Sequence, residues 1–426
     1  MSLGAGSVSG QSEWAKRVGS VSGQSEWAKR AGSVSGQSEW AKRVGSVSGK
    51  SFENKVIGFR RALHRVPELD FELPRTRAFL LSVLEPLGCE IRDLGKAGFT
   101  AYFAAASGGA AAKKTIAFRS DMDAIPIREP AGCAFRSEHE GAMHACGHDG
   151  HMGMLLGLAA WIAGHPGEAG ANALLVFQAA EETTGGAKLI CDTGVLRDYG
   201  VSRIYGIHLW PGYPENTVVC RPGAFMAGTF VINVIAEGRA AHIAEYQKGA
   251  DALEAGCLFV LRAYELEKAL PASVFRLIRF GEFQSGSASN IVADRARITG
   301  AIRAYDDETF DYFKTGLEKI MRGIETETGV KLRYEKSEGY PAVVNPPALY
   351  EETRKTLAGA GFSWFELKSP ILQAEDFSYY QREAPGLFMH LGTGEGARLH
   401  SPEYTLDESV LMTGVGLMRA LLIGGK

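Results

Sequence analysis

The chain lacks the sequence signals of several common enzyme classes. It contains no Gly-x-Ser-x-Gly motif, and its glycine-rich run at 392–396 is not followed by the Lys-Ser/Thr pair of a phosphate-binding loop. Nucleophilic-serine and nucleotide-binding mechanisms therefore lack support. No apolar run approaches the roughly 18–20 residues that a membrane span requires, so we expect no membrane partner.

Cysteine is scarce, and basic charge is not in excess. The six cysteines have no disulfide-framework spacing and the N-terminus has no hydrophobic secretory segment, so we expect reduced thiols in a cytosolic, hence cytoplasmic, protein. The first 50 residues hold seven Lys/Arg and three Glu, which leaves 39 basic and 46 acidic residues in the rest. Nucleic-acid binding needs clustered Lys and Arg, so this acidic balance argues against a nucleic-acid partner.

Residues 1–50 are repetitive and differ from the rest of the chain. A 13-residue unit begins at Gly6, Gly19 and Gly32, and a fourth copy starts at Gly45. Each full copy offers one Trp and little other apolar surface, which does not offset the entropy of ordering. We predict a flexible tail without a catalytic role. The alternatives are a short Trp-bearing helix in each copy that docks on the body, or a scaffold that acts through the tail, which deletion of 1–49 tests.

From residue 51 onward the pattern is that of a globular α/β protein, and a chain of 426 residues favours two domains. Amphipathic helices over 52–66 and 75–87 precede apolar strands that alternate with helices. This alternation predicts a mostly parallel sheet with helices on both faces. The strands are expected near 99–105, 114–119, 173–178, 201–208 and 217–220, and the helices near 151–164 and 185–196.

After Gly223 the expected order of elements changes to β-α-β-β-α-β, which describes a compact α+β unit of the ferredoxin-like type. Its strands are expected at 230–235, 274–280, 291–304 and 330–335, and its helices at 250–269 and 307–328. A strand over 387–391 and a closing helix over 407–423 follow. We therefore predict a small domain at 224–336 inserted into a larger α/β domain made of 51–223 and 337–426.

Four side chains of metal-ligand type lie within eight residues, in His144-Ala-Cys146-Gly-His148-Asp-Gly-His151. Thiolate and imidazole are ligands of zinc and related metals. Because the cluster lies in a glycine-flanked loop before an apolar helix, we predict that Cys146 and His148 bind metal. His144 and His151 are expected to orient ligands or to satisfy the loop backbone.

Two adjacent carboxylates, Glu181 and Glu182, follow the apolar strand at 173–177, at the sheet edge where α/β enzymes place ligands. Neighbouring side chains point different ways, so one can bind metal while the other takes a proton from water. The alternative is a pair of solvated glutamates at a helix start. Asp121 and Asp123 share one side of another strand end, where an Asp either orients a ligand or simply makes a turn.

Two further histidines are candidates for the site. His208 ends the strand predicted at 201–208, and His400 lies near the end of the chain. Each one alone is an ordinary histidine, and position at a sheet edge favours a role in the site without deciding it.

Taken together, these residues resemble the M20 metallopeptidases, in the amidohydrolase branch that includes aminoacylases, hippurate hydrolases, plant auxin-conjugate hydrolases and N-acetyldiaminopimelate deacetylases. The resemblance covers about 52–424. The matching stretches are Phe59-Arg-Arg-Ala-Leu-His64, Phe118-Arg-Ser-Asp121-Met-Asp123, Met143-His-Ala-Cys146-Gly-His148, Phe177-Gln-Ala-Ala-Glu181-Glu182, Gly206-Ile-His208, Ala374-Glu-Asp-Phe377 and Leu399-His400-Ser-Pro.

The resemblance implies a catalytic metallohydrolase domain with two divalent metal ions, and an inserted domain that acts as a lid and a dimerisation surface. It implies that Cys146 is shared between the metals, whose ligands are Cys146, His148, Glu182, His208 and His400. It also implies Glu181 as the general base with Asp123 in support, His242 of the lid as an oxyanion donor possible across a dimer, and Asn290 and Arg303 as contacts of the substrate carboxylate.

The function implied is hydrolysis of the amide bond of small N-acyl amino acids by a homodimer or homotetramer. A narrower alternative is deacetylation of N-acetyldiaminopimelate, and an alternative of a different class is a non-catalytic, metal-stabilised binding protein. Two departures from the family pattern stand out: Glu245-Tyr246-Gln247 after the lid histidine, which bears on substrate preference, and Ala179 before Ala180-Glu181. Zn, Mn, Co and Ni all remain open as the metal.

Overall fold

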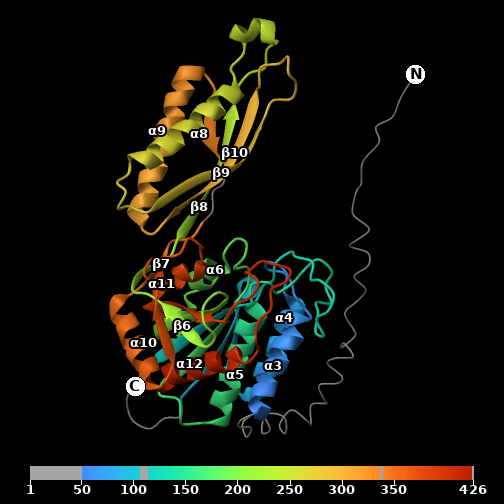
Figure 1. Cartoon of the computed structure of the whole chain (residues 1–426), viewed down its shortest axis with the longest axis vertical. Helices are drawn as coiled ribbons and strands as arrows, with labels where there is room; N and C mark the ends of the chain where they lie inside the picture. Colours follow the sequence, from blue (N-terminus) through green and yellow to red (C-terminus); the bar gives the residue numbers. More distant parts are fainter. Residues whose placement is uncertain (1–49, 106–113, 336–338, 425–426) are drawn as a thin grey trace, which may run out of the picture.

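A computed structural model describes residues 50–105, 114–335 and 339–424, and the repeats at 1–49, with the predictions made for them, lie outside the described residues (Figure 1). The described chain is built around two sheets. A short two-stranded ladder of β7 (Gly223–Met226) and β12 (Val343–Asn345) lies where the chain passes from the larger sheet to the smaller one and back. Among the described helices, none is both long and apolar enough to cross a membrane.

The larger sheet has eight strands in the order β1-β2-β4-β3-β5-β14-β6-β13. Its core strands β4, β3, β5 and β14 are parallel to one another, whereas β1, β2 and β6 each pair antiparallel with a neighbour. The strands are β1 (Glu90–Asp93), β2 (Gly98–Phe103), β3 (Thr115–Asp121), β4 (Asn172–Gln178), β5 (Val201–Trp210), β6 (Thr217–Cys220), β13 (Ser363–Glu366) and β14 (Gly386–Gly392).

Helices cover both faces of this sheet, and each face has its own buried apolar cluster. One face packs against α3 (Lys50–His64), α4 (Pro74–Leu84), α5 (His148–Gly164), α10 (Pro347–Gly359) and α12 (Val410–Gly424). The other packs against α6 (Gly186–Asp192), α7 (Val195–Asp198) and α11 (Tyr380–Glu383). Short 3-10 turns complete this part: η3 (Glu85–Leu87), η4 (Gly95–Ala97) and η6 (Asp376–Tyr379).

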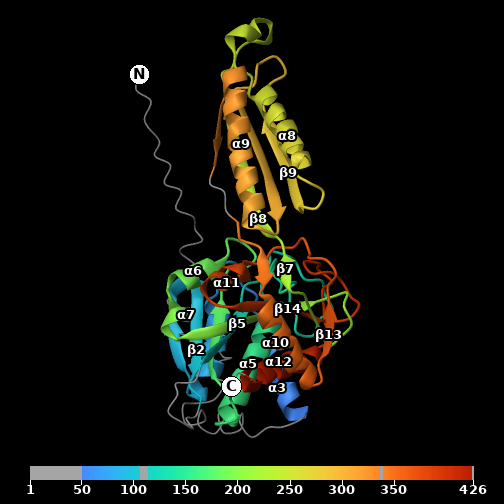
Figure 2. The same ribbon diagram turned by 90° about the vertical axis from the view of Figure 1, so that its left-hand side faces the viewer.

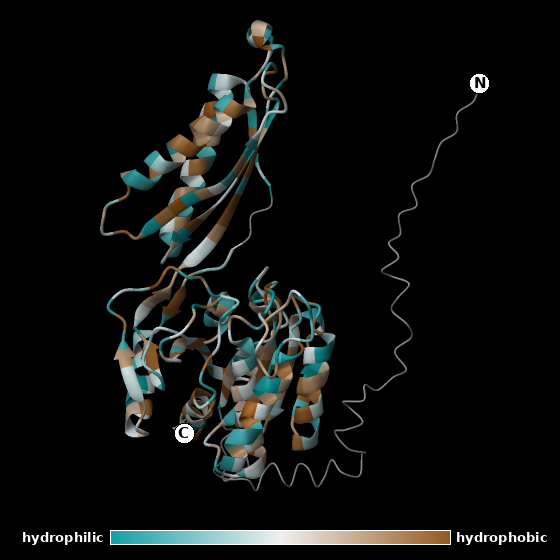
Figure 3. Cartoon of the chain, turned by 45° about the vertical axis from the view of Figure 1, so that its right-hand side comes forward, coloured by the Kyte–Doolittle hydropathy of each residue, from teal (hydrophilic) through white to brown (hydrophobic). Residues whose placement is uncertain are grey.

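The smaller sheet has four antiparallel strands in the order β11-β8-β10-β9, with two helices on one face. Its elements are β8 (Gly228–Glu237), η5 (Ile243–Lys248), α8 (Ala252–Ala269), β9 (Arg276–Ser285), β10 (Arg295–Ala304), α9 (Asp307–Thr328) and β11 (Lys331–Tyr334). Apolar residues of α9 recur at helical spacing and are buried, at Phe310, Phe313, Leu317, Met321 and Ile324. Polar and apolar residues accordingly lie side by side along the helices in Figure 3.

These observations confirm the predicted fold class, an α/β protein with a mostly parallel sheet and an α+β unit. Figure 2 places the smaller sheet and its helices at one end of the larger body. Every element of the smaller sheet falls within 224–336; the domain limits themselves remain a proposal. The helix predicted near 151–164 is present as His148–Gly164, so His148 belongs to the helix and not to the loop before it. The helix predicted near 185–196 was wrong: it is two short helices, because Gly194 adopts a left-handed conformation (φ 74°) between them.

Candidate active site

Cys146 and His148 lie at the point where a buried loop turns into α5. Gly147 makes that turn with φ at 85°, and a Cβ atom there would lie 2.9 Å from the Tyr404 hydroxyl. Only glycine fits this position without strain. His148 is therefore the first residue of the helix, and both ligand candidates are buried at the carboxyl edge of the larger sheet.

The rings of His148 and His208 are held in the same way. The Nδ1 atom of His148 donates to the carbonyl oxygen of Asp123 at 2.8 Å, and the Nδ1 atom of His208 donates to the carbonyl oxygen of Leu209 at 2.8 Å. This leaves both Nε2 atoms free to face the site, and within the described ranges the buried Nε2 of His148 has no hydrogen-bond partner. The Nε2 of His208 lies 3.4 Å from the Sγ of Cys146. Metal-binding histidines are typically oriented by such a bond at the other ring nitrogen.

Glu181 and Glu182 occupy a strained turn after β4. Ala180, just before them, has φ at 55°, a left-handed conformation that a residue with a Cβ rarely adopts. The Asp123 carboxylate accepts hydrogen bonds from the backbone N–H groups of Glu181 and Glu182, each at 3.0 Å. Asp123 therefore fixes the backbone that carries both glutamates.

His400 reaches the same site from near the end of the chain. Its backbone also has a left-handed conformation (φ 63°), and its N–H donates to the carbonyl oxygen of Ala145 at 2.9 Å. Its Nε2 lies 3.1 Å from the Oε1 of Glu182.

Among the groups of donor atoms in this site, two share Cys146. Cys146, His148 and His208 form one group, and Cys146, Glu182 and His400 form the other; in each group the donor atoms lie within 4.8 Å of one another. A thiolate, imidazoles and a carboxylate are a donor set that suits zinc and similar divalent ions. Together with the unpartnered Nε2 of His148, this donor set fits a metal centre.

The site concentrates negative charge in a buried place. Burial raises the pKa of Glu181 well above its usual value, and the carboxylates of Glu375 and Glu182 raise it further. Burial likewise raises the pKa of the Cys146 thiol well above its usual range, with the nearby glutamates adding to the effect. A bound cation would offset this charge, because it favours the ionised forms of both groups.

A second layer of polar groups supports the ligands from behind. His151 donates from Nδ1 to Asp121 at 2.6 Å and accepts at Nε2 from the Leu209 N–H at 2.9 Å. Arg119 donates to Asp121 and to Asp376, each at 2.7 Å. Asp121 thus ends β3 with its carboxylate bound to His151 and Arg119, and His151 bonds to the backbone of β5 rather than to that of its own loop. Within the described part of the chain, both ring nitrogens of His144 are unpartnered.

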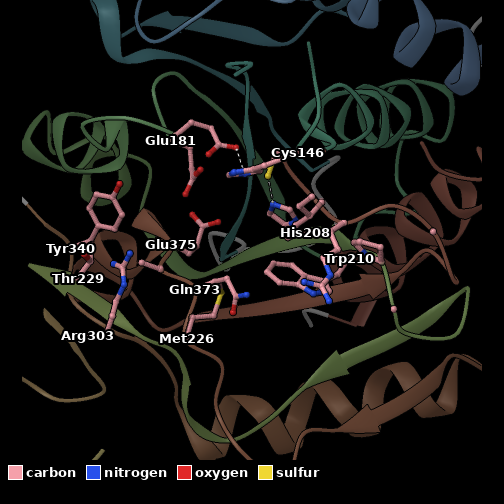
Figure 4. A pocket seen from close by; sticks show the side chains of 18 of the residues that line it. Cys146, Glu181, His208, Trp210, Met226, Thr229, Arg303, Tyr340, Gln373 and Glu375 are labelled. Carbon is pink, nitrogen blue, oxygen red and sulfur yellow. Dashed lines mark hydrogen bonds and ion pairs between the residues drawn. The ribbon is translucent and has the colours of Figure 1, made fainter. Parts of the chain in front are cut away.

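The site opens into a cavity of about 820 Å³ between the two sheets (Figure 4). Its wall includes Cys146, Glu181, Glu182, His208, Trp210, Met226, Thr229, Val231, Arg303, Tyr340, Gln373, Glu375, Arg398 and His400. Glu375 faces Glu181 in Figure 4, and no role was predicted for it although Ala374-Glu-Asp-Phe377 carried part of the family resemblance. That stretch was the available signal.

The predicted residues of the inserted unit separate into two places. Arg303 lies in the cavity wall, and within the described ranges its Nη1 is buried without a hydrogen-bond partner. His242 and Asn290 are exposed and adjoin one another beyond the far end of β8, where the Ile243 N–H donates to the Asn290 carbonyl oxygen at 3.0 Å. Neither is part of the cavity wall. The chain by itself therefore brings Arg303, but not His242 or Asn290, to the metal-ligand candidates.

The arrangement of these donor residues agrees with the protein family that the sequence matches. Residues 117–423 match the peptidase family M20/M25/M40. The chain belongs to this family. Because the M20 relatives are amidohydrolases and peptidases, the chain is a metal-dependent hydrolase.

Relatives match over nearly their whole length. An N-acetyldiaminopimelate deacetylase of Shouchella clausii is 32% identical over 380 residues, which cover 88% of this chain and 99% of the relative. Among solved structures, a dinuclear metal-binding M20 peptidase of Bacillus subtilis has a TM-score of 0.75 at 28% identity, with 88% of this chain and 98% of that one covered. A candidate aminohydrolase of methicillin-resistant Staphylococcus aureus has a TM-score of 0.82 at 29% identity, with coverage of 88% and 97%.

Proposed function

We propose that the protein hydrolyses the amide bond of N-acyl amino acids, with two divalent metal ions, to a carboxylate and a free amino acid. The observation that carries this proposal is the pair of three-donor groups that share Cys146, with Glu181 beside them in the wall of one cavity. The deacetylase relatives and the dinuclear metal-binding relative support it.

The metal ions would be held by Cys146, His148, Glu182, His208 and His400. When bound, such ions polarise the amide carbonyl and lower the pKa of water from 15.7 toward about 7. Glu181 takes the proton of the attacking water and delivers it to the leaving amine. Its place next to Glu182 and its backbone anchor on Asp123 favour this role.

Substrate binding is proposed to rest on Arg303. Its guanidinium group is part of the cavity wall, and its Nη1 is buried without a hydrogen-bond partner among the described residues, so a substrate carboxylate would satisfy it. Asn290 and His242 are proposed to complete the site from a second copy of the chain, as carboxylate contact and oxyanion donor. Such a donor is commonly worth about 2.7–4 kcal/mol.

The decisive variant is Glu181→Gln, which keeps the shape of the side chain but removes its basicity. We expect wild-type metal content and a turnover lower by about 10²–10⁴, since that is the usual contribution of a general base. Turnover is measured as free amine released from N-acetyl and N-benzoyl amino acids, and metal by elemental analysis. Glu168→Gln, at an exposed position, serves as the control. Wild-type turnover with full metal content rules out Glu181 as the base.

The proposed sharing of Cys146 between the two metal ions leads to a second prediction. Cys146→Ala is expected to lower the content of both metals, because one residue contributes a donor to each group. Elemental analysis of the purified variant measures this, with Cys257→Ala, at an exposed cysteine, as control. Two metals retained per chain in Cys146→Ala would contradict the shared-ligand assignment.

A narrower substrate, N-acetyldiaminopimelate, is favoured by the names of several relatives. Comparison of this compound with the N-acyl amino acid panel, before and after chelation, separates the two. A metal-loaded protein silent on every compound would point to an unusual acyl substrate or, against the family assignment, to the binding-protein alternative. Metal identity among Zn, Mn, Co and Ni, the cytoplasmic location, and assembly as a homodimer or homotetramer remain predictions.

A further inference from the structure

A second set of ligand-type side chains surrounds a separate, smaller cavity. His64 at the end of α3, with Glu129 and Cys133 of the loop that follows β3, offers three donor atoms that lie within 4.8 Å of one another. The same three residues line a cavity of about 130 Å³ together with residues that follow His400. None of the three lines the larger cavity, and none has a part in the proposed hydrolysis.

The His64 ring is fixed from behind by a carboxylate. Its Nδ1 lies 2.8 Å from the Oδ2 of Asp149, and that oxygen also accepts from the Nε of Arg60 at 2.9 Å. The Nε2 of His64 is directed to the other side, 3.2 Å from the Oε1 of Glu129. A histidine whose second ring nitrogen is bound to a carboxylate is the arrangement typical of zinc ligands.

The two remaining donors are also placed by their surroundings. The second oxygen of Glu129 accepts from the backbone N–H of Ser137 at 2.7 Å, which leaves Oε1 toward His64. The Cys133 side chain is half-buried and forms a hydrogen bond with Glu129. Glu129 and His64 are themselves almost fully buried, so the cluster is built into the fold rather than gathered on its surface.

We propose that His64, Glu129 and Cys133 form a binding site for an additional Zn²⁺, separate from the catalytic centre. Three protein donors and one water molecule from the cavity complete the tetrahedral shell that zinc prefers. On binding, the thiol and the imidazole release their protons to solvent, and Arg60 remains paired with Asp149. The cation ties the 129–137 loop to the end of α3.

The alternative state needs no cation: a protonated His64 between Asp149 and Glu129 satisfies the same groups. Zinc content distinguishes the two. The full-length wild type, Cys133→Ser and Cys257→Ser are each saturated with Zn²⁺, freed of unbound metal and analysed for zinc per chain. We expect the wild type and Cys257→Ser to hold one zinc more than Cys133→Ser, and all three to hydrolyse the same substrates at the same rate. Equal zinc content in all three proteins overturns the proposal.

A measurement on the wild type avoids any folding defect of the variant. Each cysteine is alkylated with iodoacetamide, and the modified peptides are quantified by mass spectrometry with and without Zn²⁺. At ten times the dissociation constant the unbound fraction falls about tenfold, so alkylation of Cys133 is expected to slow about tenfold while that of the exposed Cys257 does not change. An unchanged rate at Cys133 overturns the proposal. Since neither readout depends on hydrolysis, failure here leaves the proposed function untouched.

Discussion

Asp123 acts at the scale of a single residue by holding two neighbouring backbone groups. Each of its carboxylate oxygens accepts one N–H, from Glu181 and from Glu182, and its own carbonyl oxygen orients the His148 ring. The proposed base and two proposed metal ligands thus depend on one buried aspartate.

Asp123→Asn tests this dependence. An asparagine amide presents one oxygen and one NH₂ group, so a donor would face one of the two backbone donors. We expect metal affinity or kcat/KM to fall about 10–100-fold, as is usual when a group that orients ligands is lost. Metal titration and substrate kinetics measure it, and Asp192→Asn on the exposed end of α6 is the control. A variant with unchanged metal affinity and kinetics would show that Asp123 does not position the site.

Among the candidate site residues, the sequence alone predicted those whose proximity follows from short spacing along the chain. Cys146 and His148 are two positions apart in one turn, so their common direction follows from the loop itself. Glu375 was missed as a member of the site because its neighbour Glu181 is 194 positions away, a proximity that only the folded sheet creates. The left-handed conformation of Ala180 was equally hidden, because alanine carries no signal for it.

At the scale of elements, α3 and α5 are joined by a buried ion pair. The Nε of Arg60 donates to Asp149 at 2.9 Å, and both side chains are almost completely buried. Arg61, the next residue, is half-exposed and pairs with Glu408, a mostly buried carboxylate that also accepts from the Nη1 of Arg60 at 3.0 Å.

Replacing each of these two arginines in turn compares how much a buried and a half-exposed arginine contribute to the free energy of unfolding. Arg60→Met leaves the Asp149 charge buried with one partner fewer, and we expect the free energy of unfolding to fall by about 3–5 kcal/mol. Arg61→Met removes a half-exposed arginine and leaves Glu408 paired with Arg60, so about 0–1 kcal/mol is expected. Denaturant titrations of both variants measure the difference. Equal losses of stability in the two would contradict the assignment of α3–α5 packing to Arg60.

The predicted elements were mostly right in place, and the predicted mostly parallel sheet left the direction of individual strands open. β6 follows β5 after a connection of only six residues, 211–216, and pairs antiparallel with β14. A parallel crossover takes a dozen or more residues, so this short connection already excluded a parallel β6. β13 and β1, at the edges of the sheet, are four residues long and were not predicted. The inserted unit was predicted better because the amphipathic period of α9 runs over 22 residues.

At the scale of the whole molecule, one chain leaves the proposed site incomplete. Thr229, at the start of β8, is in the cavity wall, whereas His242 follows the far end of that strand. Ten residues at about 3.3 Å each place the two ends about 30 Å apart, beyond the reach of any side chain. Several large exposed apolar side chains belong to the same unit and lie outside the cavity wall, which favours contact with a second copy: Ile243, Tyr246, Leu253, Leu261, Phe275, Phe283 and Ile291.

If a second copy supplies His242, two inactive variants restore each other. Glu181→Gln lacks the base and His242→Ala lacks the donor, so each homodimer is expected to be nearly inactive. In a statistical mixture made by co-expression, half of the dimers are mixed, and in each the chain with intact Glu181 receives His242 from its partner, which restores about a quarter of the wild-type sites. Activity of doubly tagged, purified mixed dimers measures this, and in these one of the two sites, half of the wild-type number, is expected to be active. Activity no higher than that of the two parents would mean that His242 acts within its own chain, after movement of the inserted unit, or takes no part in the reaction. Full activity of His242→Ala on its own would remove it from the mechanism.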